Sequence, residues 1–67
     1  MEIQKYYYNE DYKMLYVEYI DGDDDNSIEL EYNDILIYSP QVITEEDLNE
    51  IDEDFVLEIV QEYLKSL

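Results

Sequence analysis

The chain has no cysteine, no histidine and no arginine, and lysine at three positions supplies all of its side-chain cations. Without cysteine there is neither a disulfide framework nor thiol chemistry, which suits a reducing cytoplasm. Nucleophilic catalysis, general acid–base catalysis and zinc sites lean on organised sets of His, Cys, Lys or Arg, and of these the chain has only three scattered lysines. A pair of carboxylates could serve a glycosidase, but 67 residues hardly enclose a sugar-sized cleft. We therefore expect a binding protein that is not an enzyme and needs no cofactor.

Residues that break secondary structure are also scarce, with one glycine and one proline. Hydrophobic residues make up 46% of the chain, too many for a disordered acidic tail. No apolar run is long enough to cross a membrane, and no signal-peptide segment is visible. We expect one folded domain over residues 1–67, located in the cytoplasm and close to the lower size limit for a single core.

Charge of one sign dominates what is present. Twenty acids oppose three lysines, and the formal net charge is -17, far more than solubility requires. Such a field repels nucleic acid and anionic membranes and steers basic protein surfaces onto the chain. The expected partner is a basic protein, with no direct binding to nucleic acid or membrane.

The first half of the chain is rich in residues that favour strands. In the longest strand segment, Leu15, Val17 and Tyr19 share the face that we expect a helix to cover. The acidic run 21–26 is the predicted loop of a β-hairpin, and Pro40 ends the last strand. The predicted strands are residues 3–8, 12–20, 27–32 and 35–38.

The last third, residues 45–66, has apolar residues at steps of three and four and predicts an amphipathic helix that Thr44 caps. Asp52 could itself cap a second helix beginning at Glu53. We favour one long helix with an irregularity at residues 51–54. The predicted fold class is α+β, a small antiparallel sheet of three to four strands followed by one C-terminal amphipathic helix.

Acids recur at every fourth position of this predicted helix: Glu46, Glu50, Asp54, Glu58 and Glu62. Like charges at this spacing cost about 0.2 to 0.5 kcal/mol per pair, so four pairs oppose folding by about 1 to 2 kcal/mol. A core this small rarely supplies more than about 3 to 5 kcal/mol. A solvated face would normally mix charge signs, and the row therefore predicts a partner-binding surface.

Tyrosine is the second abundant feature, and nine tyrosines exceed what so small a core can bury. Tyrosine is enriched at protein interfaces, and acids beside it suit a basic partner. The other interpretation is strand propensity alone. Besides the acidic row, the predicted partner-binding residues are Asp23, Asp24, Asp25, Glu29, Glu31, Tyr12 and Tyr16.

The loop around residues 21–29 resembles a calcium loop in part. Asp21, Asp23 and Asp25 alternate as in an EF-hand, but Tyr32 stands where a bidentate glutamate is needed. A solvated acidic turn is the simpler interpretation, and a calcium-binding module stays an alternative.

A step of four helical residues rises about 6 Å, which is of the same order as the spacing of phosphates along a nucleic-acid strand. In charge, size, lack of cysteine and expected α+β build, the chain resembles the DNA-mimic class of small phage and plasmid inhibitors. That class includes anti-CRISPR proteins, anti-restriction proteins and inhibitors of uracil-DNA glycosylase. The resemblance implies a phage-encoded inhibitor of a CRISPR effector or another nuclease in the host cytoplasm, and the short length favours an anti-CRISPR protein.

Two further hypotheses concern partners. An acidic immunity or antitoxin protein that neutralises a basic nuclease toxin would share the same electrostatics. Free strand edges and a small core would also allow a homodimer.

Overall fold

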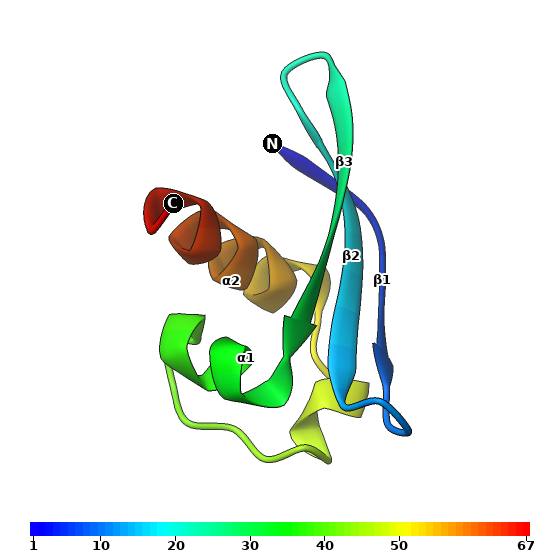
Figure 1. Cartoon of the computed structure of the whole chain (residues 1–67), viewed down its shortest axis with the longest axis vertical. Helices are drawn as coiled ribbons and strands as arrows, with labels where there is room; N and C mark the ends of the chain where they lie inside the picture. Colours follow the sequence, from blue (N-terminus) through cyan, green and yellow to red (C-terminus); the bar gives the residue numbers. More distant parts are fainter.

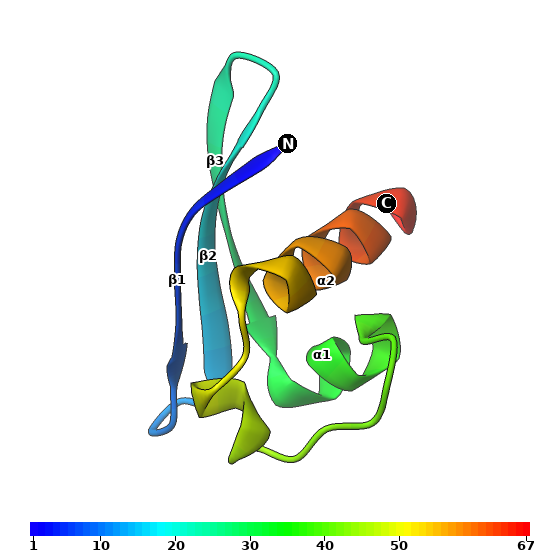
Figure 2. The same cartoon turned by 180° about the vertical axis from the view of Figure 1, so that it is seen from behind.

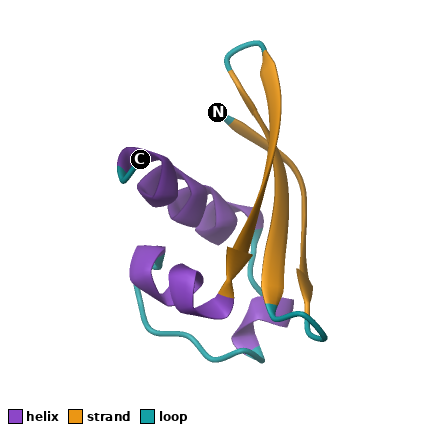
Figure 3. Cartoon of the chain, viewed as in Figure 1, coloured by secondary structure: helices purple, strands orange, loops and turns teal.

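The computed structural model describes every residue from Met1 to Leu67 and contains a sheet followed by helices (Figure 1). The three strands pair antiparallel in the order β1-β2-β3. Figure 3 shows the helices gathered on one face of this sheet. The predicted α+β class, a small antiparallel sheet with a C-terminal helix, is confirmed. The elements are β1 (Glu2–Asn9), β2 (Met14–Asp21), β3 (Asp24–Glu31), α1 (Tyr32–Tyr38), the 3-10 turn η1 (Asp47–Asn49) and α2 (Glu53–Lys65).

The core lies between the sheet and the helices. Leu15 and Val17 on the central strand are fully buried, and Tyr19 is nearly so, as their alternation predicts. Side chains from α2 meet them from the helical layer. The eleven buried residues are all hydrophobic: Ile3, Leu15, Val17, Tyr19, Leu30, Ile35, Ile43, Leu48, Val56, Ile59 and Val60. The opposite face of the sheet carries no helix (Figure 2).

The predicted strand at residues 35–38 is wrong, because this segment belongs to helix α1. A short apolar run fits a buried strand or a buried helix equally well by periodicity. In the helix only Ile35 is fully buried, while Ile37 is 71% exposed. The backbone N–H of Tyr32 still donates to the carbonyl of Lys13 at 3.2 Å. The last hydrogen bond between β3 and the β2 side of the hairpin is therefore made by the first residue of α1.

The prediction of one long helix over residues 45–66 is also wrong, because α2 begins at Glu53. Asp52 caps it, since the Phe55 N–H donates to Asp52 Oδ1 at 2.9 Å. The alternative of a break at Asp52 is correct. Thr44 lies far from the start of α2 and instead exchanges hydrogen bonds with Asp47, the first residue of η1, at 3.1 and 3.3 Å.

The hairpin loop is shorter than predicted. Asp21 pairs with Asp24, which leaves Gly22 and Asp23 as a two-residue turn, and Gly22 adopts the positive φ of 68° that this turn requires. Strand β3 therefore begins at Asp24, and the hairpin projects beyond the helices (Figures 1 and 2). No helix of the chain combines the length and the apolar character that crossing a membrane requires.

Candidate protein-binding surfaces

The twenty acids are almost uncompensated in the folded chain. None is buried. Only two form ion pairs: Glu45 with Lys13 at 3.9 Å and Glu62 with Lys65 at 3.2 Å. Both pairs are solvent-exposed, and such pairs contribute little to stability. The folded chain therefore presents nearly its whole negative charge to solvent.

The predicted acidic row does not run along one helix. Asp54, Glu58 and Glu62 lie on α2, whereas Glu46 and Glu50 flank η1 on the other side of the Asp52 cap. The spacing of four between acids continues in the sequence across Asp52, although the helix does not, and this spacing predicts an unbroken row. Two successive like-charge pairs remain on α2, and they oppose folding by about 0.4 to 1 kcal/mol.

A second set of acids lies on the β2–β3 hairpin. Asp23 occupies the turn and Asp24 closes it, while Asp25, Glu29 and Glu31 follow at alternating positions along β3. Alternation directs the last three toward the sheet face without helices. Asp21, Asp23 and Asp25 stand in this tight turn and its flanking strands instead of a calcium loop, and no group of three or more acids in the structure could hold a metal ion.

The face without helices is aromatic at its centre. Tyr7 and Tyr16 are cross-strand partners, and their ring centroids lie 5.2 Å apart with the planes inclined at 34°. Lys5 places its Nζ 5.8 Å from the Tyr7 ring centroid, within the range of a cation–π contact. The Tyr16 hydroxyl donates to Glu18 Oε1 at 2.9 Å. This hydrogen bond, helped by partial desolvation, raises the pKa of Tyr16.

Beside this pair the sheet is hollowed. Tyr12 is 76% exposed and stands in the β1–β2 turn, whose backbone is held by Asn9 Oδ1. We call this feature the tyrosine hollow; it measures about 430 Å³ and is lined by Tyr7, Asn9, Tyr12, Met14, Tyr16 and Glu29. The hollow brings together three of the predicted partner-binding residues, Tyr12, Tyr16 and Glu29. The turn acids Asp23 and Asp24 and the α2 acids lie outside it.

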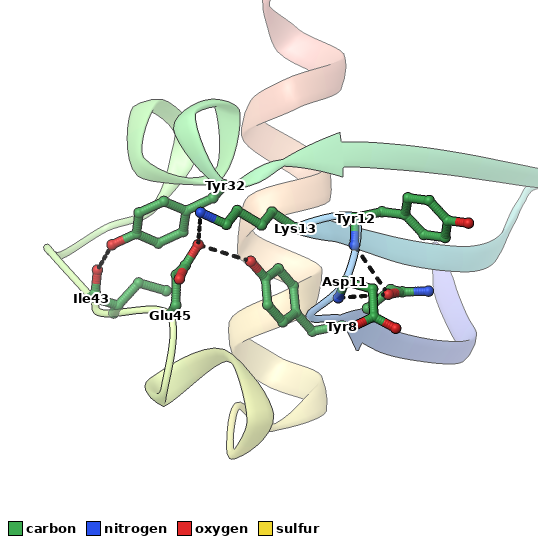
Figure 4. Close-up of polar contacts among 8 residues, drawn as sticks. Tyr8, Asp11, Tyr12, Lys13, Tyr32, Ile43 and Glu45 are labelled. Carbon is green, nitrogen blue, oxygen red and sulfur yellow. Dashed lines mark hydrogen bonds and ion pairs between the residues drawn. The ribbon is translucent and has the colours of Figure 1, made fainter.

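Three tyrosines have a structural role at the other side of the sheet, and Figure 4 shows two of them, Tyr8 and Tyr32. The Tyr32 hydroxyl donates to the carbonyl of Ile43 at 2.7 Å, and the Tyr8 hydroxyl donates to Glu45 Oε1 at 3.4 Å. Tyr6 similarly donates to the carbonyl of Ile51 at 3.3 Å. Desolvation, and then the negative charge of Glu45, raise the pKa of Tyr8. These hydroxyls hold the segment between α1 and α2 against the strands.

Tyr12 points away from this network in Figure 4, which separates the structural tyrosines from the exposed ones. Sequence reasoning missed Tyr7 and Met14 as parts of the exposed set. Met14 shares a face of β2 with Tyr16 by alternation. Only the strand register places Tyr7 beside Tyr16, and β1 has a register shift between Ile3 and Lys5 that no alternation reveals.

Comparison of the chain with protein-family models, with curated proteins and with solved structures gave no match.

Proposed function

We propose that this chain is a non-enzymatic inhibitor that occupies the cationic nucleic-acid-binding cleft of a DNA-binding protein, presenting carboxylates where the cleft expects phosphates. The observation that best supports this is the charge pattern. Every acid is at least partly exposed, and only Glu45 and Glu62 are matched by a cation. Double-stranded nucleic acid is likewise a rigid scaffold with closely spaced negative charge.

The dimensions of the chain fit such a cleft. The longest extent is 33 Å, and the other two are 21 and 18 Å. One turn of duplex DNA is about 34 to 36 Å long. Acids on the hairpin and acids on α2 spread charge over more than one side of this body, whereas one straight row would have charged a single side.

Within this proposal the target is a CRISPR effector or another nuclease that contacts DNA through lysine and arginine. The chain would then act in the cytoplasm of a host cell as an anti-CRISPR or anti-restriction protein. A cleft of that kind gains much of its affinity for DNA from releasing counterions on charge neutralisation. The same attraction would draw in a protein of net charge -17.

The test is capture of a partner from lysates of a CRISPR-bearing bacterium, with tagged chain and with or without duplex DNA. We expect a basic DNA-binding protein that is lost when duplex is added in excess. A partner that stays bound in excess duplex would contradict the proposal and would favour the immunity-protein alternative.

Paired charge reversals test whether the location of the acids matters. Asp54→Lys with Glu58→Lys alters α2, and Asp24→Lys with Asp25→Lys alters the hairpin. The matched control is Glu2→Lys with Ile37→Lys and Val42→Lys, which changes net charge by the same amount at exposed sites elsewhere. We expect at least one of the first two pairs to abolish capture while the control retains it. Equal loss in all three would mean that net charge alone, and no defined surface, governs binding.

A further inference from the structure

We infer that the tyrosine hollow is an anchoring site for an arginine side chain of the partner protein. The inference rests on the proposed function, because it assumes a basic protein partner. It goes further by naming one place on the surface and one side-chain chemistry.

First, the Tyr7–Tyr16 pair offers aromatic rings that are partly exposed and already held in place. Tyr16 is held by its tilted ring contact with Tyr7 and by its hydrogen bond to Glu18. Tyr7 and Tyr12 are 49% and 76% exposed, and neither hydroxyl has a hydrogen-bond partner in the chain. Rings that are already ordered lose little entropy when a planar group stacks on them. The hollow is therefore prepared for a flat partner group.

The second step is a cation that the chain itself places on these rings. Lys5 stands over Tyr7 at 5.8 Å and lies beside Glu18 in the strand register. The hollow extends the other way from the Tyr7–Tyr16 pair, toward Asn9 and Met14. The other lysines, Lys13 and Lys65, pair with Glu45 and Glu62. Lys5 does not line the hollow, and the other lysines are paired elsewhere, although Tyr7, one of the lining rings, already attracts a cation.

The third step is the carboxylate at the rim. Glu29 lines the hollow, and Glu31 pairs with Met14 at its edge. A guanidinium group can stack on a tyrosine ring and bind a carboxylate through two N–H groups at once. An ammonium group is more strongly hydrated and lacks the planar fork. Rings and carboxylate together therefore favour arginine over lysine, and the same acids repel a phosphate group.

The experiment compares acetylated, amidated tetra-arginine and tetra-lysine, which carry equal charge, in NMR titrations of the full chain. We expect tetra-arginine to bind about two- to five-fold tighter than tetra-lysine, a difference about the size of one cation–π contact at an exposed site. Its shifts should centre on the rings of Tyr7, Tyr12 and Tyr16 and on the methyl group of Met14. Equal affinity for the two peptides, or shifts centred on α2, would overturn the inference.

Variants separate the hollow from general attraction. In Tyr12→Ser combined with Glu29→Gln, the preference for arginine should fall toward about one-fold, because the most exposed ring and the rim carboxylate are both gone and Lys5 already lies over the Tyr7 ring. In Asp24→Asn combined with Asp25→Asn, both peptides should weaken while the preference persists. Ile37→Ser, a change at a similarly exposed site on α1, is the matched control and should leave the preference intact. A preference that survives in the first variant would refute the assignment.

The two proposals fail separately. Loss of the arginine preference with duplex-sensitive capture intact would remove the hollow and leave DNA mimicry. An intact arginine preference with capture that is indifferent to duplex would remove DNA mimicry and leave the hollow as an arginine site.

Discussion

Replacing Asp52 by alanine tests the helix break that separates Glu46 and Glu50 from the acids of α2. The Asp52 carboxylate accepts a hydrogen bond from the Phe55 N–H at 2.9 Å. Removing an N-cap of this kind costs about 0.5 to 2 kcal/mol, typically about 1. For a domain of this size we expect a melting temperature lower by about 4 to 8 °C.

The sign of the change distinguishes the two helix arrangements. In an uninterrupted helix, alanine would be favoured over aspartate by up to about 0.7 kcal/mol, and the substitution would raise stability. Thermal unfolding followed by circular dichroism measures the difference directly. Asp52→Asn is the control, since asparagine caps as well as aspartate does and only the charge is lost. A melting temperature that is unchanged or higher in Asp52→Ala would refute the break, and the intact acidic row would have to be reconsidered.

Two further predictions concern charge and hydroxyl groups. Raising salt from about 0.1 to 1 M shortens the screening length from about 10 to 3 Å, so the melting temperature should rise; a flat or falling value would show that the acids do not repel as argued. The pKa values of Tyr8, Tyr16 and Tyr19 are raised, so the folded state favours their protonated form. Their contribution to stability should be complete below the ordinary tyrosine pKa of about 10 and lost as pH rises through the raised values. Ultraviolet absorbance of tyrosinate checks this, because these three tyrosines should ionise at higher pH than the others. If the absorbance change at high pH were the same in Tyr16→Phe, the assignment of Tyr16 to that group would be contradicted.

The central strand was predictable because its apolar residues alternate with a period of two. Leu15, Val17 and Tyr19 alternate with less buried positions, and the structure buries all three. The helix break at Asp52 was only the less favoured alternative, because Leu48, Ile51 and Phe55 keep helical spacing across it. Leu48 is buried and the other two pack against the same core. A periodic pattern reports which side faces the core and does not report whether the backbone between the apolar residues is continuous.

The site was predictable only in part for a different reason. Tyr12, Tyr16 and Glu29 were named from composition and charge, but their proximity depends on pairing between strands. Tyr16 meets Tyr7 and Glu29 through the registers of β2 with β1 and with β3. The β2–β3 register follows from a two-residue turn, whereas the β1–β2 register includes an irregularity near Lys5. Tyr7 therefore could not be placed without the structure.

The tyrosine content has two explanations, strand propensity and partner contact, and the position of Tyr12 bears on the choice. Tyr6, Tyr8 and Tyr32 use their hydroxyls to hold the segment between the helices, which accounts for them structurally. Tyr12 lies in a turn, where strand propensity gives no reason for tyrosine, and its ring is largely exposed without a hydrogen-bond partner. Because it supports nothing inside the chain, Tyr12→Ser should leave stability nearly unchanged. Any loss of binding in that variant is then a loss of contact with the partner.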